Sequence, residues 1–163
     1  MSKKFILVLG GNGFIGAEVV DYLIKNNNNY EFILLNRGNW SDWDTSERIK
    51  PRVYENIIFD RKKDSAKNCL KKYIEDESFE FEAIIDFSGY KSRDIKSVID
   101  DIPAKKIKLY IYISTDSVYE VCIDKNDDNG CVVLNEDDSI RPESKEKQKT
   151  SKEFDSYGHH KLR

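Results

Sequence analysis

Several features that would mark a particular class of protein are missing from this sequence. Its three cysteines are an odd number and include no C-x-x-C pair, which argues against a disulfide framework and a zinc site. No apolar run approaches the length of a membrane span, and the first one begins directly after Met-Ser-Lys-Lys, which leaves no room for a signal peptide. The net charge is -3 with both signs mixed, unlike the basic patches that bind nucleic acid or membranes. We therefore expect a cytoplasmic protein with no metal site, no membrane contact and no nucleic-acid partner.

What the sequence does contain is an alternation of short apolar runs with amphipathic segments. The runs predict strands at 5–9, 31–35, 57–59, 83–87 and 109–113, and residues 66–74 and 95–102 show helical spacing. Parallel strands joined by helices need right-handed crossovers, so we expect an α/β fold with a doubly wound parallel sheet. A chain of 163 residues fits a single domain, 1–163.

A glycine-rich turn lies between the first predicted strand and the helix after it. Gly11, Gly13 and Gly16 satisfy G-x-G-x-x-G, and Gly10 gives a second, wider spacing. Such a turn lets the backbone approach a pyrophosphate at a helix N-terminus, which is typical of a Rossmann fold that binds NAD(P). The alternative is a turn whose glycines merely allow packing. The predicted cofactor contacts here are Gly10, Gly11, Asn12, Gly13, Phe14, Ile15 and Gly16. Phe14 and Ile15 also begin the apolar pattern of the helix, which extends to Ile24.

The polar residues that follow the next three strands extend the predicted cofactor site. A dinucleotide-binding fold often has a carboxylate after the second strand to hold the ribose, but Asn36 and Arg37 stand there. An arginine can pair with a 2′-phosphate, so we favour NADP over NAD; a solvated arginine without a ligand is the alternative. Asp60 could accept a hydrogen bond from adenine, and Ser88 with Gly89 ends the fourth strand at the ligand-binding edge.

Near the end of the chain, Tyr157 and Lys161 are four residues apart and share one face of a helix that begins near Phe154. An ammonium beside a phenol favours the phenolate, so Tyr157 could move a proton while Lys161 holds the nicotinamide ribose. Thr115, after the fifth strand, would hold the substrate oxygen. The predicted catalytic residues are therefore Thr115, Tyr157 and Lys161, although any helix can show this spacing by chance. His159 and His160 are predicted to be surface residues.

Three further segments carry weaker predictions. Residues 39–54 show poor periodicity, which indicates a short or broken helix in which Trp40 and Trp43 serve packing. Residues 120–156 are polar and highly charged, and we expect a long polar loop there. The one regular element that we predict within it is a short strand at 131–134. Cys69 is expected on the apolar face of a helix.

Taken together, the glycine loop, Asn36-Arg37-Gly38, the stretch at 113–119 and the Tyr157 motif resemble the extended short-chain dehydrogenase/reductase superfamily, and within it the NAD-dependent epimerase/dehydratase family. The Asn-Arg-Gly ending and residues 86–90 are most similar to a subgroup that includes chloroplast stem-loop binding proteins. The resemblance implies an oxidoreductase or epimerase that acts on a nucleotide sugar, and it allows a homodimer. Family members run about twice this length, so it also implies a cofactor-binding N-terminal portion that is truncated before the last strands and the substrate lobe.

The chain departs from one branch of that family. Sugar-nucleotide 4,6-dehydratases carry Thr-Asp-Glu after the fifth strand; here Thr115 and Asp116 match, but Ser117 replaces the glutamate, which argues against dehydration. Two alternatives stay open at this point. One is an RNA-binding or regulatory protein on the same fold, and the other is a catalytically dead remnant that still binds the cofactor.

Overall fold

The computed structural model of the protein describes residues 4–40, 45–122 and 135–162. Within these ranges the chain divides into two compact units. The first unit contains residues 4–40, 45–89 and 94–113, and the second contains residues 90–93, 114–122 and 135–162.

The first unit is built on a parallel sheet, as the apolar runs predicted. Its strands lie in the order β3-β2-β1-β4-β5, and every neighbouring pair is parallel. The chain therefore crosses from one half of the sheet to the other between β3 and β4, next to β1, which gives the doubly wound arrangement. The strands are β1 (Lys4–Leu9), β2 (Tyr30–Asn36), β3 (Glu55–Ile58), β4 (Phe81–Asp86) and β5 (Tyr110–Tyr112).

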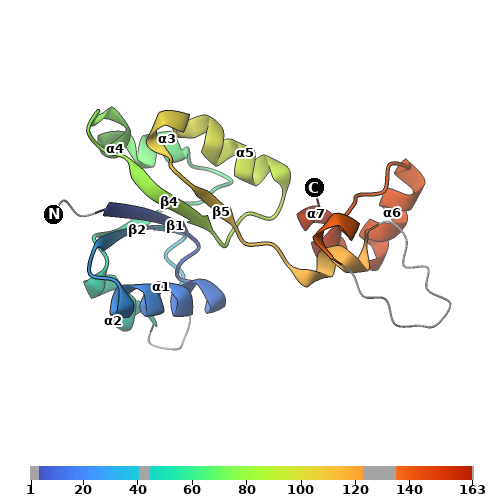
Figure 1. Ribbon diagram of the computed structural model, residues 1–163, viewed down its shortest axis with the longest axis horizontal. Coiled ribbons are helices and arrows are strands. Elements are labelled where there is room, and N and C mark those ends of the chain that lie inside the picture. Colours follow the sequence, from blue (N-terminus) through green and yellow to red (C-terminus); the bar gives the residue numbers. More distant parts are fainter. Residues whose placement is uncertain (1–3, 41–44, 123–134, 163) are drawn as a thin grey trace. The chain divides into compact units, whose positions relative to one another are not determined.

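Helices cover both faces of this sheet (Figure 1). One face carries α1 (Phe14–Asn26) and α2 (Thr45–Ile49), and the other carries α3 (Ala66–Cys69), α4 (Lys71–Glu75) and α5 (Ser92–Asp101). Two short 3-10 helices, η1 (Lys50–Arg52) and η2 (Ala104–Lys106), complete the connections.

Alternation along the strands produces two separate cores, one on each face of the sheet. In β1, Leu7 and Leu9 pack toward the side of α3, α4 and α5, whereas Ile6 and Val8 pack toward α1 and α2. Because both faces are covered, the central strands are apolar at nearly every position. Burying each such aliphatic side chain contributes about 1.5–3 kcal/mol, so these cores fix where the carboxyl ends of the strands lie.

The second unit is helical. It contains the 3-10 helices η3 (Asp116–Glu120) and η4 (Glu136–Asp138) and the helices α6 (Lys145–Phe154) and α7 (Ser156–Lys161). A small apolar cluster of Val118, Val121 and Leu162 joins η3 to the end of α7. No helix in the described ranges is long and apolar enough to cross a membrane.

The structure corrects several local predictions. Residues 66–74 form two short helices rather than one, because the chain leaves the helical conformation at Leu70. Phe14 and Ile15 are 73% and 59% exposed, since α1 meets the sheet only from Gly16 onward. The predicted excursion contains α6, a helix that the sequence analysis missed.

Other local predictions can be followed directly. The broken helix expected within 39–54 appears as α2 and η1, Trp40 packs against the core on the α1 side, and Cys69 packs against the opposite core. The predicted strand at 131–134 and Trp43 lie outside the described residues.

Candidate functional site

The glycine loop joins the carboxyl end of β1 to the N-terminus of α1 in the first unit. Gly10 has a positive φ of 75°, which favours glycine, and its N–H donates to Leu35 O at 3.0 Å. Gly13 is the N-cap of α1 and gives it no side-chain cap, and the first turn contains no acidic residue. The positive end of the helix dipole and its first N–H groups therefore face the loop without a capping side chain from Gly13.

The absence of a side chain has a different explanation at each glycine of the loop. A Cβ at Gly16 would clash with the carbonyl oxygen of Gly10, and one at Gly11 would lie 3.0 Å from Val8 Cγ1. A Cβ at Gly13 would meet only Gly10 O, at 3.4 Å, and Gly13 is exposed. Packing thus requires Gly16 and crowds Gly11, while at Gly13 a Cβ would make only one ordinary van der Waals contact.

The turn after β2 is shaped by Asn36, which is 4% exposed. Its Nδ2 donates to Asn56 Oδ1 at 2.6 Å, and its Oδ1 accepts from Gly38 N at 2.9 Å. Both ends of the Asn36 side chain are thus engaged inside the protein, while Arg37 is exposed. Asn12 in the glycine loop donates to Asn39 O at 2.6 Å, which ties this turn to the loop.

Asp60, two residues beyond β3, lies within reach of three positive or polar groups. The N–H of Lys62, which lies 3.0 Å from Asp60 Oδ1, lowers the pKa of the Asp60 carboxyl, and the charges of Lys63 and Arg37 lower it further. The carboxylate therefore stays ionised near neutral pH as an acceptor. Arg37, which is predicted to bind a phosphate, thus lowers the pKa of Asp60, which is predicted to bind adenine.

Ser88 and Gly89 are held by a buried carboxylate. Asp86, the last residue of β4, is fully buried and accepts from Ser88 N at 2.9 Å and Gly89 N at 2.8 Å. Arg61 Nη2 donates to both carboxylate oxygens of Asp86, at 2.8 and 2.9 Å. Tyr110 Oη donates to Asp86 Oδ2 at 2.7 Å, and burial, followed by the charge of Asp86, raises the pKa of this phenol. The Tyr110 hydroxyl therefore remains a donor.

This network went unnoticed in the sequence analysis. A single signal pointed to it: Asp86 is a charged residue that ends an otherwise apolar strand. Arg61 gave no signal, because it lies among charged residues in a loop and its partner is 25 residues away.

The three residues predicted to be catalytic all belong to the second unit. Thr115 caps η3: its Oγ1 accepts from Ser117 N at 3.3 Å and donates to Asp116 Oδ1 at 3.2 Å. Asp155 caps α7 by accepting from Tyr157 N at 2.9 Å and Gly158 N at 3.1 Å. Gly158 is buried, and a Cβ there would clash with Ser117 O, so this glycine lets α7 approach η3. The fold thus brings the helix of Tyr157 and Lys161 to the turn that begins at Thr115.

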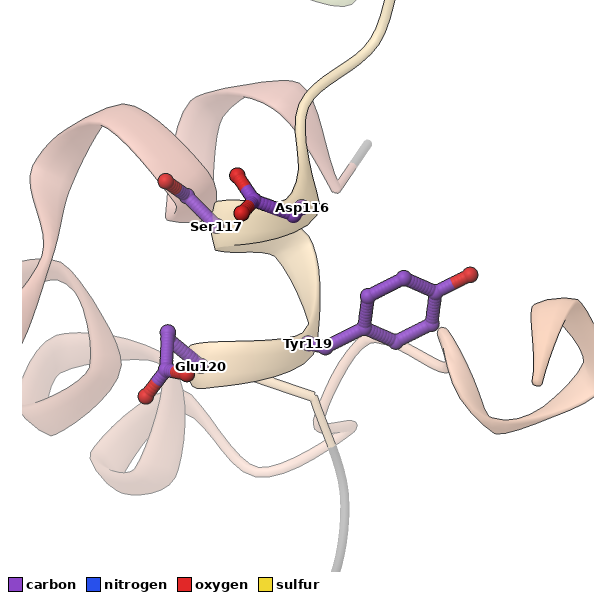
Figure 2. Close-up of a pocket in the computed structure, with 4 residues that line it drawn as sticks. All are labelled: Asp116, Ser117, Tyr119 and Glu120. Carbon is purple, nitrogen blue, oxygen red and sulfur yellow. The ribbon is translucent and has the colours of Figure 1, made fainter. Parts of the chain in front are cut away.

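A shallow cavity of about 230 Å³ lies along η3 and is lined by Asp116, Ser117, Tyr119 and Glu120. Figure 2 shows these four side chains on that one turn, with Tyr119 directed away from Ser117 and Glu120. Its carboxylates and hydroxyls suit a polar, uncharged or cationic group better than an anion. Among the described residues, no cluster of three or more metal-ligating side chains is present.

Within α7, Lys161 is 7% exposed, and its Nζ lies 5.8 Å from the ring centroid of Tyr157. His159 is also buried, at 6% exposed, with its Nε2 3.3 Å from Arg141 Nη2. The prediction that His159 lies on the surface is therefore wrong: in a helix of six residues between η3 and residues 141–148, more than one face is covered. The glycine loop, Asn36, Arg37, Asp60, Ser88 and Gly89 belong to the first unit.

Comparison with protein-family models gives one match that spans almost the whole chain. The model described as "NAD dependent epimerase/dehydratase family" matches residues 6–162. A comparison with curated protein sequences gave no match.

Several solved structures share the fold at low sequence identity. The UDP-Glc/GlcNAc 4-epimerase of Campylobacter jejuni is 17% identical, with a TM-score of 0.62 over 94% of this chain and 50% of that one. The dTDP-glucose 4,6-dehydratase of Bacillus anthracis, in complex with NAD, is 18% identical, with a TM-score of 0.59 over 95% and 52%. A wide-type short-chain dehydrogenase/reductase of Veillonella parvula, in complex with NADP, is 19% identical, with a TM-score of 0.52 over 72% and 50%. The chain spans about half the length of these structures.

Proposed function

The chain belongs to the NAD dependent epimerase/dehydratase family, and on that basis we propose that its glycine loop binds the pyrophosphate of a nicotinamide dinucleotide. The observation that carries this proposal is that Gly13 has room for a side chain and yet has none. Packing accounts for Gly16 and largely for Gly11, but not for Gly13, whose missing side chain leaves the first amides of α1 accessible. A phosphate there would accept those N–H groups and meet the positive end of the helix.

We further propose that the cofactor is NADP. Arg37 is exposed at the carboxyl end of β2, while the side chain of Asn36 beside it is turned inward. Neither residue has a carboxylate that would hold the ribose hydroxyls or repel a 2′-phosphate. A guanidinium can pair with a 2′-phosphate through two hydrogen bonds. Asn12 supports this assignment, because its bond to Asn39 O holds the turn of Arg37 against the glycine loop. Of the similar structures, one holds NADP and three hold NAD.

The reaction we propose is the transfer of a hydride between the nicotinamide and a hydroxyl-bearing carbon of a nucleotide-sugar-like substrate. When bound, the nicotinamide supplies or accepts that hydride. Tyr157 moves the proton of the substrate hydroxyl, and Thr115 donates a hydrogen bond to the same oxygen. Lys161 holds the nicotinamide ribose, and its Nζ lies 5.8 Å from the ring centroid of Tyr157. We further propose that residues 1–163 are a single domain and that the reaction uses no metal.

The test of cofactor choice is a pair of fluorescence titrations of the chain, one with NADPH and one with NADH. We expect NADPH to bind more tightly, and Arg37→Gln to weaken NADPH by about 10- to 100-fold while changing NADH little, because a charge-assisted hydrogen bond is worth about 1.5–3 kcal/mol. Lys67→Gln removes the same charge from α3 and serves as the matched control, which should change neither affinity. Tighter binding of NADH, or an unchanged ratio in Arg37→Gln, would overturn the NADP assignment.

A further inference from the structure

Tyr90 makes contacts that none of the roles proposed above explains. Residues 90–93 belong to the second unit, although their neighbours along the chain on both sides belong to the first. The ring of Tyr90 lies against the ring of Tyr157, with centroids 5.0 Å apart and an interplanar angle of 60°. This tilted arrangement is one that aromatic pairs favour.

Lys161 lies beside both rings. Its Nζ is 5.7 Å from the centroid of Tyr90 and 5.8 Å from that of Tyr157, so the two rings share the ammonium almost equally. Because Lys161 is only 7% exposed, water solvates the charge poorly, and the negative faces of the rings supply part of the missing stabilisation. Tyr90, Tyr157 and Lys161 therefore form one cluster.

The position of Tyr90 argues against a role in the core alone. Half of its surface is exposed, and it lies outside the apolar cluster of Val118, Val121 and Leu162. Helix α7 has only six residues, and a helix that short is marginal without tertiary contacts. The orientation of Tyr157 and Lys161 thus depends on what packs against them, and Tyr90 packs against both.

We propose that Tyr90 is a positioning residue for the Tyr157–Lys161 pair, an inference that rests on the proposed function. It holds the phenol and the ammonium in a fixed relation, so that Lys161 is already oriented for the nicotinamide ribose when the cofactor arrives. Binding then does not have to immobilise a flexible lysine side chain. The aromatic ring of Tyr90 carries this role, and its hydroxyl is not required.

The contact itself can be tested without any cofactor. In an NMR spectrum of the chain, the ring currents of Tyr90 and Tyr157 should shift the Lys161 side-chain protons upfield of the positions that they take in the unfolded chain. Tyr90→Leu should lose much of that shift, and Tyr90→Phe should keep it. Tyr54→Leu is the matched control, because Tyr54 is 55% exposed and also lies 5.0 Å from one aromatic ring, that of Phe5. A Lys161 shift that is the same in Tyr90→Leu would overturn the inference.

The positioning role is tested by comparing NADPH with 2′,5′-ADP, which lacks the nicotinamide ribose. We expect Tyr90→Leu to bind NADPH about 5-fold more weakly, with 2′,5′-ADP unchanged and Tyr90→Phe like the unaltered chain. Equal effects on both nucleotides, or on neither, would mean that Tyr90 is only structural and would overturn the role. An unaltered chain that binds neither nucleotide would instead refute the proposed function, and the NMR experiment would then still decide whether Tyr90 holds Lys161.

Discussion

Two matched substitutions in the glycine loop should have different consequences. Gly13→Ala and Gly16→Ala each add one methyl group, three residues apart in the same loop. The structure gives these methyl groups different surroundings: an ordinary contact with Gly10 O at 3.4 Å for Gly13, and a clash with that same carbonyl for Gly16. We expect the first substitution to impair binding and the second to impair folding.

For Gly13→Ala, the effects on stability nearly cancel. Alanine is a poorer N-cap than glycine, which costs about 1 kcal/mol, and it restricts the unfolded chain, which returns about 0.4–1 kcal/mol. The backbone at Gly13, with φ -80° and ψ 173°, is accessible to alanine. A methyl group in the path of the pyrophosphate would keep the first amides of α1 from hydrogen-bond distance. The loss of one such bond to an anion costs about 1.5–3 kcal/mol, or about 10- to 100-fold in the Kd of NADPH.

For Gly16→Ala, the methyl group meets backbone rather than a flexible side chain, so β1 and α1 must separate. Overpacking of this kind costs about 1–3 kcal/mol, only partly offset by the better helix propensity of alanine. Urea unfolding followed by circular dichroism measures the stability of both variants, and titration with NADPH measures their binding. Unchanged NADPH binding in Gly13→Ala would refute the proposal that a ligand lies beside Gly13, and full stability in Gly16→Ala would refute the packing argument.

Two further predictions concern buried charges. Burial alone would raise the pKa of Asp21, but hydrogen bonds from Lys25 and Arg52 outweigh it and lower that pKa. Stability from this carboxylate is thus present above its unfolded pKa and is lost as the pH falls through the folded one, so urea midpoints should drop below about pH 4. Asp21→Asn should flatten this dependence; parallel curves would contradict the reasoning. Arg61→Met leaves Asp86 without its guanidinium and should cost about 3 kcal/mol in urea unfolding. Adding Asp86→Asn should not add to that loss, whereas a double variant with summed losses would show that the pair is not coupled.

The sheet was predictable from sequence because its strands are buried on both faces. A short apolar run between two amphipathic segments, such as 5–9 or 83–87, is typical of a parallel strand and of few other elements. The glycine loop was predictable for a similar reason, since a turn between a buried strand and a helix has few solutions. The sequence could not show that packing requires Gly16 but not Gly13, because the spacing of the motif treats the two glycines alike.

The helical unit was far less predictable. Helix α6 buries no residue, and its only large apolar side chain, Phe154, is 72% exposed, so no apolar periodicity marks it. Local contacts hold its start instead: Ser144 caps it by accepting from Lys147 N at 3.3 Å, and Gln148 Nε2 donates to Pro142 O at 2.6 Å. Such side-chain bonds stabilise a helix end without leaving a pattern that a hydrophobic period can detect.

The polar residues at the strand ends explain why only part of the candidate site could be predicted from the sequence. Asn36, Asp60, Asp86 and Thr115 each accept, through a side-chain oxygen, the backbone N–H of the residue two positions later. This local bond shapes the turn after the strand, which is a common use of Asx and threonine side chains. A polar residue at a strand end is therefore first a turn former. Arg37 follows Asn36 and Ser88 comes two residues after Asp86; both are exposed, and both belong to the cofactor site that we propose. The turn after β1 is formed by glycines instead, and it is the turn at which we propose that a pyrophosphate approaches the backbone.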